Sequence, residues 1–159
     1  MVYCDRFFIS MKIEEEIKQS SFRNSHQKAS INLLFTYHWL INRHKDFFKP
    51  FGITNQQFNI LRILRGQHPK SISGADIRER MLDKNSDVSR LLDRLLTKRL
   101  VAKSQCPSDK RAADVQITDK GLELLKQIDF KVDSLDNILD ALSADEASQL
   151  SLLLDKSRK

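Results

Sequence analysis

The stretch from residue 85 to residue 121 constrains the fold most strongly, because its hydrophobic period changes from helical to strand-like. Two short runs with strand character, 100–105 and 113–117, are joined by a polar loop at 106–112. Before them, apolar residues recur at the spacing of a half-buried helix, at Val88, Leu91, Leu92, Leu95 and Leu96. A helix and a hairpin in this order predict a winged helix-turn-helix, provided that another helix precedes them.

Two further helices are expected directly before this stretch. The first begins at Thr54 in a capping box, Thr-Asn-Gln-Gln, and ends at Gly66. After a loop at 67–72, Ser73 is expected to cap a short helix that runs to about Met81. The chain therefore contains the helix pair that the motif requires.

Long helices flank this central part. Residues 25–49 are apolar around much of a helix, so more than one side must be covered, and a second subunit is expected on one of them. Residues 119–142 carry apolar side chains every three or four positions, which predicts one long helix that packs along another. Ser143 begins a last helix in a second capping box. That helix is expected to bury Ala147, Leu150, Leu153 and Leu154.

These elements predict a mainly α protein with a small β-hairpin wing. Four glycines and three prolines leave few turns in 159 residues, which favours helices. Residues 1–24 are expected to form an N-terminal arm that is disordered or becomes ordered only with a partner. Residues 54–118 are expected to form a winged helix-turn-helix domain, and residues 25–53 together with 119–159 a helical dimerisation layer.

Positive charge is concentrated in the expected winged domain. Residues 54–118 hold 13 Lys and Arg against 7 Asp and Glu, whereas residues 119–159 hold 6 against 9. A basic segment of this kind attracts polyanions such as nucleic acid.

Several other classes of protein are not expected. No apolar run reaches the ~18 residues of a membrane span, and the N-terminus lacks the features of a signal peptide. Two cysteines, Cys4 and Cys106, make no disulfide framework, so a cytoplasmic protein is expected. The four histidines lack the spacing of metal ligands, and no phosphate loop or nucleophile motif is visible. We expect no cofactor, no metal and no enzymatic activity.

Several motifs follow one another in a fixed order. They are Val-Ser-Arg-Leu-Leu-Asp-Arg-Leu at 88–95, Leu-Val at 100–101, Asp-Lys-Arg at 109–111 and Ile-Thr-Asp-Lys-Gly at 117–121, with Ile-Thr-Asn-Gln-Gln-Phe-Asn-Ile-Leu at 53–61 upstream. This ordered set resembles the motifs of the multiple-antibiotic-resistance regulator (MarR) family of bacterial transcription factors. The resemblance covers about residues 26–157. Arg99 departs from it, because the family usually has glycine there; Arg99 must either adopt the left-handed conformation or end the helix differently.

The polar face of the helix at 85–99 is the expected DNA reader, with Asn85 or Ser86 as its cap. Arg90 suits a bidentate contact with guanine, and Asp87 suits either cytosine or the helix start. For Arg94, the alternative to a DNA contact is a salt bridge to Asp87 or Asp93. The predicted DNA-binding residues are Lys70, Ser71, Ser73, Asn85, Ser86, Asp87, Ser89, Arg90, Arg94, Asp109, Lys110 and Arg111.

The resemblance implies that Arg111 in the wing enters the minor groove and that Asp109 orients it; a purely structural Asp109–Arg111 pair is the alternative. For Ser73, the alternative to a DNA contact is that it only caps its helix. A homodimer would place two recognition helices ~34 Å apart, on a palindromic operator of double-stranded DNA. The expected function is thus a transcriptional regulator, with repression as the favoured mode.

A small aromatic effector is a further hypothesis. Its expected pocket lies where the dimerisation layer meets the winged domain, and its candidate residues are Tyr37, His38, Trp39 and His44, which have plain core packing as their alternative. Two other functions stay open: a winged-helix protein-interaction module without DNA binding, and a regulator that senses oxidation at Cys106.

Overall fold

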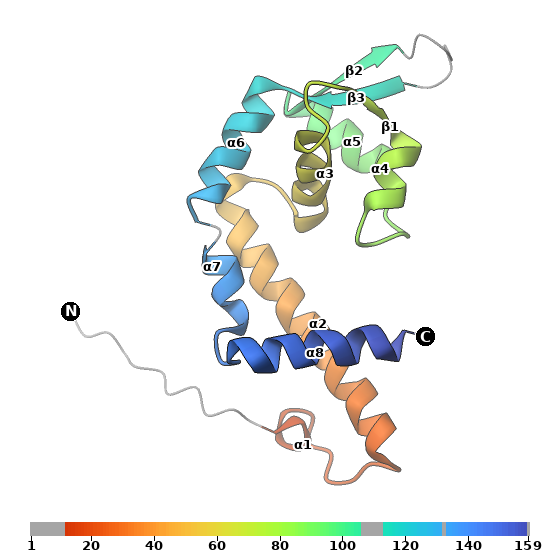
Figure 1. The fold of residues 1–159 in the computed structure, drawn as a ribbon, viewed down its shortest axis with the longest axis vertical. Helices are drawn as coiled ribbons and strands as arrows, with labels where there is room; N and C mark the ends of the chain where they lie inside the picture. Colours follow the sequence, from red (N-terminus) through yellow and green to blue (C-terminus); the bar gives the residue numbers. More distant parts are fainter. Residues whose placement is uncertain (1–11, 106–112, 132, 159) are drawn as a thin grey trace, which may run out of the picture. The chain divides into compact units, whose positions relative to one another are not determined.

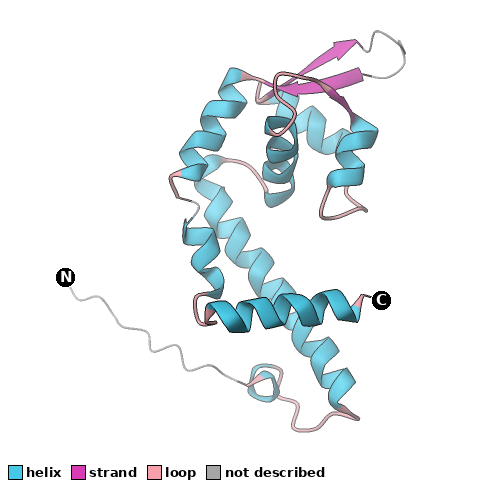
Figure 2. Ribbon diagram, in the orientation of Figure 1, coloured by secondary structure: helices cyan, strands magenta, loops and turns pink. Residues whose placement is uncertain are grey.

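The computed structural model describes residues 12–105, 113–131 and 133–158. The chain divides into two compact units, Met1–Asn42 and Arg43–Lys159. Figures 1 and 2 show the elements along the chain.

Helices dominate the described residues, as the sequence predicts, and one small sheet accompanies them (Figure 2). The elements are α1 (Ile13–Glu16), α2 (Ser25–Phe48), η1 (Lys49–Phe51), α3 (Asn55–Arg65), β1 (Ile72–Ser73), α4 (Gly74–Arg80), α5 (Val88–Thr97), β2 (Val101–Gln105), β3 (Ala113–Ile117), α6 (Asp119–Asp129), α7 (Asp133–Asp136), η2 (Asn137–Leu139) and α8 (Ala144–Ser157). Within the described residues, every helix is too short or too polar to cross a lipid bilayer.

The first unit contains a short helix in a region for which only an arm was expected. Ile13 opens α1 and is 5% exposed. Glu14 forms an ion pair with Lys28 of α2, with 2.5 Å between Oε1 and Nζ. The ammonium group of Lys28 and the hydrogen bond that it donates lower the pKa of Glu14. These contacts give residues 12–28 a defined local structure.

The sheet has three antiparallel strands in the order β1-β3-β2. The predicted hairpin pairs Val101 with Ile117 and Lys103 with Val115. The third strand was not predicted, because 67–72 was expected to be a loop; Ile72 pairs with Val115 from β3. This pairing ties the start of α4 to the middle of β3.

The core of the second unit lies between α3, α4, α5, α6 and the sheet. Helix α3 contacts α4, α5, α6 and β3, and its Ile60, Leu61 and Leu64 have no exposed surface. The apolar face of α5 predicted from the sequence is buried at Val88, Leu91, Leu92 and Leu95, while Leu96 is half-buried. Burial of one face of α5 fixes which of its residues face solvent.

The predicted helix caps at Thr54, Ser73 and Ser143 are confirmed. The Thr54 hydroxyl accepts the Gln57 amide, and the Ser143 hydroxyl accepts the Glu146 amide; both capping boxes are complete. The Ser73 hydroxyl accepts the amide of Asp76. The backbone and hydroxyl hydrogen bonds from Ser143 lower the pKa of Glu146.

Arg99 adopts the left-handed conformation, with φ of 58°. The chain bends there because the Leu100 amide bonds back to the carbonyl of Leu95 and the Arg99 amide to that of Leu96. This is one of the two outcomes expected for a non-glycine residue after the helix.

The single long helix predicted at 119–142 is wrong. Helix α6 ends at Asp129, and α7 begins only at Asp133. Contacts distant in sequence hold the end of α6: Arg65 pairs with Asp129 at 2.6 Å, and the Lys131 ammonium lies 5.6 Å from the centre of the Phe51 ring. The leucine spacing continues in phase through the break and therefore does not reveal it.

The burial predicted for the last helix is also wrong for the isolated chain. In α8, Leu150 is 39% exposed and Leu153 is 63% exposed; Ala147 is exposed and Leu154 is half-buried. Leu152, which was not predicted to be buried, is 68% exposed. The apolar side chains of α8 are thus only partly covered within one chain.

Candidate nucleic-acid interface

Helix α5 presents a polar face on the side opposite its buried residues. Its cap is Asp87, whose carboxylate accepts the amide of Arg90 at 3.0 Å. The prediction that Asn85 or Ser86 is the cap is therefore wrong. With Asp87 outside the helix, Ser89 and Arg90 lie in the first turn of α5, and both are exposed.

The two arginines on this face keep their charge available. Among the described residues, neither Arg90 nor Arg94 forms an ion pair. The alternative expected for Arg94, a salt bridge to Asp87 or Asp93, does not form. Asp93 pairs instead with Lys103 of β2, with 3.1 Å between Oδ1 and Nζ. That pair links α5 to the first strand of the hairpin, a contact the sequence did not reveal.

Ser86 does not lie on the exposed face on which the sequence places it. It is 8% exposed, and its hydroxyl donates to Asp83 Oδ2 at 3.0 Å. This hydrogen bond satisfies the buried hydroxyl away from water. Asn85 is exposed, and its side chain makes no hydrogen bond to the described residues.

The residues predicted before α4 lie next to the sheet. Lys70 is exposed, and Ser71 is half-buried with its hydroxyl 3.5 Å from Asp114 Oδ2. The Ser73 hydroxyl caps α4 and also donates to Asp76 at 2.8 Å. Of the three, Lys70 is the side chain least engaged within the described part of the chain.

The wing residues Asp109, Lys110 and Arg111 lie outside the described residues. The strands that lead to the wing, β2 and β3, are described and form the predicted hairpin.

The C-terminal end of α5 is held by three hydrogen bonds. Lys98 Nζ donates to the carbonyl of Gly52 at 2.5 Å. Lys120 Nζ donates to the carbonyl of Lys98 at 2.9 Å, and the Thr118 hydroxyl donates to that of Arg99 at 2.9 Å. The end of the candidate reading helix is thereby attached to α6 and to the turn before α3.

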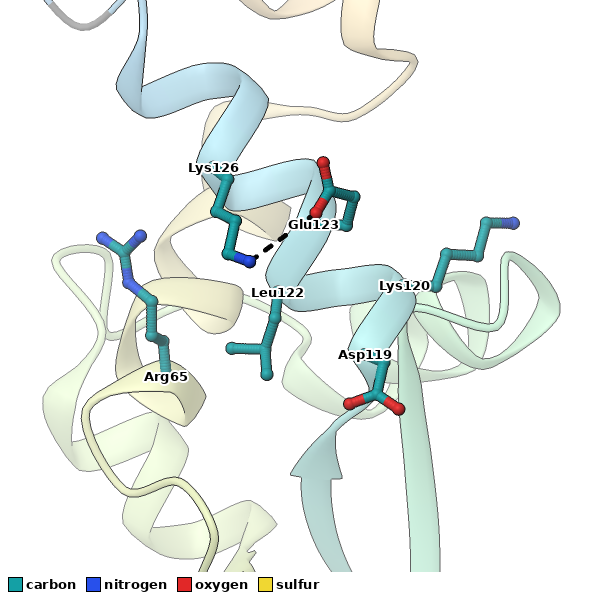
Figure 3. A pocket seen from close by; sticks show the side chains of 6 residues that line it. All are labelled: Arg65, Asp119, Lys120, Leu122, Glu123 and Lys126. Carbon is teal, nitrogen blue, oxygen red and sulfur yellow. Dashed lines mark ion pairs between the residues drawn. The ribbon is translucent and has the colours of Figure 1, made fainter.

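Two surface cavities are described in the second unit, and neither is lined by the residues predicted to bind an effector. One, of about 510 Å³, lies along α6 and is lined by Arg65, Asp119, Lys120, Leu122, Glu123 and Lys126 (Figure 3). The other, of about 390 Å³, is lined by Phe51, Lys98, Leu100, Lys120, Glu123, Leu124 and Gln127.

The four predicted effector residues fall in different units. Tyr37, which is 55% exposed, stacks edge-on against His38 in the first unit, where Trp39 is half-buried. His44 in the second unit lies edge-on to the buried ring of Phe48. Burial lowers the pKa of His44, and a hydrogen bond with the Asn55 side chain opposes the shift. The effector pocket remains a prediction.

The helices α3, α4 and α5 with the strands β1, β2 and β3 form a winged helix-turn-helix, a class of fold that presents a helix to DNA.

Comparison with known proteins narrows this class to one family. The sequence model of the MarR family matches residues 53–113. The crystal structure of a MarR transcription factor from Planctomyces limnophilus is 33% identical, covers 85% of this chain and 98% of its own, and has a TM-score of 0.67. A mutant MarR from E. coli, complexed with operator DNA, is 26% identical over 87% of this chain and 99% of its own, with a TM-score of 0.75.

A curated relative agrees with these structures. The HTH-type transcriptional regulator PecS of Dickeya dadantii (strain 3937) is 29% identical over 123 residues, which cover 76% of this chain and 74% of PecS. The chain therefore belongs to the MarR family, whose members are DNA-binding transcriptional regulators rather than enzymes.

Proposed function

We propose that this regulator binds a palindromic operator as a homodimer, with α5 of each protomer in the major groove, and that it represses transcription there. The observation that carries the proposal is the state of Arg90. It lies in the first turn of α5, is exposed, and makes no ion pair with the described residues. An arginine in that position suits the O6 and N7 acceptors of guanine.

Other residues supply contacts of different kinds. Lys70 and Arg94 are exposed cations that suit phosphates, and Asn85 and Ser89 carry exposed polar side chains next to Arg90. The wing residues Asp109, Lys110 and Arg111 are proposed to reach the minor groove, as the family resemblance implies. Ser71, Ser73 and Ser86 are proposed to act through backbone position, because their hydroxyls are engaged within the protein.

Exposed apolar side chains in both units support a homodimer. Leu152 and Leu153 of α8 are 68% and 63% exposed, and Leu34 of α2 is 58% exposed. Large exposed apolar patches mark interaction surfaces. We propose that 25–53 and 119–159 pair with the same segments of a second copy. A small aromatic effector near Tyr37, His38, Trp39 and His44 would then shift the separation of the two α5 helices.

Binding to the DNA upstream of its own gene, measured by fluorescence anisotropy over a salt series, tests the proposal. We expect tight binding that weakens steeply with salt, because several phosphates are neutralised. Arg90→Ala should weaken operator binding by about 1–3 kcal/mol and relax the preference at one base pair in each half-site. Equal affinity of the wild type for this DNA and for a scrambled duplex would refute sequence-specific binding at this location.

A further inference from the structure

The Asp83 carboxylate organises the turn between α4 and α5. Its Oδ1 accepts the backbone amide of Asn85 at 3.0 Å. Its Oδ2 accepts the Ser86 hydroxyl at 3.0 Å and the side-chain amide of Gln56 at 3.3 Å. Gln56 Nε2 also lies 3.4 Å from the Ser86 hydroxyl. Because Gln56 belongs to the first turn of α3, the carboxylate joins the turn to a second helix.

This exposed carboxylate supports the turn together with its backbone hydrogen bonds, from the Ser86 amide to the Asp83 carbonyl and from the Val88 amide to the Ser86 carbonyl. Met81 and Val88, at the two ends, are 2% and 1% exposed and anchor the turn to the core. Between them, Ser86 is the one buried residue. A buried hydroxyl that loses its acceptor is unfavourable. Loss of Asp83 would therefore release the segment that leads into α5.

The side chains on either side of Ser86 belong to the proposed reading face. Asn85 receives its position from the hydrogen bond to Asp83, and Asp87 caps α5 through the amide of Arg90. Hydrogen bonds to base edges depend steeply on distance and angle. A small displacement of this turn would thus disturb base contacts more than contacts to phosphates.

We propose that Asp83 is a positioning residue for DNA recognition, which holds residues 82–87 so that Asn85 and the first turn of α5 meet the bases in a fixed place. This inference rests on the proposed function of α5. Asp83 itself does not touch the DNA, since a carboxylate is repelled by phosphate and its oxygens are already occupied. The hydrogen bonds from Asn85, Ser86 and Gln56 also lower the pKa of Asp83.

The test separates recognition of sequence from attraction to charge. Wild type and variants are titrated with two duplexes: one recovered by repeated selection with the wild type from a random pool, and a scrambled duplex of the same composition. For Asp83→Ala, the ratio of the two affinities should fall by about tenfold. Binding to the scrambled duplex should be unchanged or slightly tighter, because a negative charge is lost. Gln56→Ala should lower the ratio in the same direction by less.

The control for charge is Asp140→Ala, an exposed carboxylate outside the winged domain, which should leave the ratio at the wild-type value. A ratio for Asp83→Ala equal to that of Asp140→Ala would overturn the inference. So would an equal loss of affinity for both duplexes, which indicates a purely structural role. If Asp83→Ala does not fold, Gln56→Ala decides, and an unchanged ratio for it counts against positioning.

Arg90→Ala distinguishes this inference from the proposed function. If Arg90→Ala lowers the preference for the selected duplex while Asp83→Ala keeps it, only the positioning role of Asp83 fails. If Arg90→Ala also keeps the preference, Arg90 does not read a base, and both proposals fail.

Discussion

Gly121 stands at the closest approach between the start of α6 and the chain that follows α5. A Cβ atom at this position would lie 2.3 Å from the carbonyl oxygen of Leu100 and 2.7 Å from Cγ1 of Ile117. The Leu100 carbonyl also accepts the amide of Thr118 at 3.1 Å, which fixes its position. Leu100 and Ile117 are each 4% exposed, so neither can move aside into solvent.

Gly121→Ala should therefore destabilise the fold, because one methyl group must displace backbone and buried side chain together. Overpacking of a well-packed core is unfavourable by about 1–3 kcal/mol, and we expect the upper end of that range. For a chain of this length each kcal/mol lowers the Tm by about 2–4 °C, which gives a fall of about 6–12 °C.

Thermal unfolding followed by circular dichroism measures the change, with Gly74→Ala as the matched control. A Cβ atom at Gly74 would meet nothing within 4 Å at the start of α4. Alanine there should leave the Tm unchanged or raise stability by up to about 1 kcal/mol. If Gly121→Ala unfolds at the wild-type temperature, the steric explanation of the Thr-x-x-Gly pattern at 118–121 is wrong.

Three other changes have defined outcomes. Arg99→Gly should raise the free energy of unfolding, measured in urea, by about 0.5–1 kcal/mol, because glycine adopts a positive φ without strain. Arg99→Ala should give no such increase, and equal effects of the two substitutions would show that the backbone at Arg99 is not strained. The pKa of His44 is lowered, so as pH falls below 6.5 the unfolded chain takes up the proton first and stability is lost. Thermal unfolding at pH 7.5 and pH 5 should therefore show a smaller difference for His44→Leu than for wild type, and an identical difference would argue against a lowered pKa of His44. Leu153→Asp should convert the proposed dimer into a monomer by sedimentation velocity, whereas Leu82→Asp, at an 86% exposed position in the turn before α5, should not. A Leu153→Asp protein that sediments as the wild type does would exclude α8 from the dimer interface.

Local features of the fold were predictable from the sequence because they depend on neighbours along the chain. The caps at Thr54, Ser73 and Ser143 need only residues within three positions. The buried face of α5 follows from the spacing of its apolar residues, and the alternation at 113–117 predicts a strand.

The features that could not be predicted depend on contacts distant in sequence. Ser86 reads as part of an exposed polar face, and only Asp83 together with Gln56, thirty positions away, explains its burial. The two-residue strand β1 exists through its pairing with β3. The end of α6 at Asp129 lies where Arg65 from α3 pairs with that residue.

The candidate reading face was predictable only where it depends on local sequence. The exposure of Ser89 and Arg90 follows from the helical period, whereas the engagement of Asp93 by Lys103 requires the folded hairpin. From the sequence, Asp87 could either contact a base or stabilise the start of the helix; in the structure it is the cap of α5.

The most direct test of α5 as the DNA reader is a nuclear magnetic resonance titration of the labelled protein with the selected duplex. We expect the largest changes in amide shift at Asn85, Ser89 and Arg90, with a stoichiometry of two chains per duplex and small changes in α6. Shifts concentrated in α6 or α8, with those of α5 unmoved at saturation, would contradict recognition by this helix.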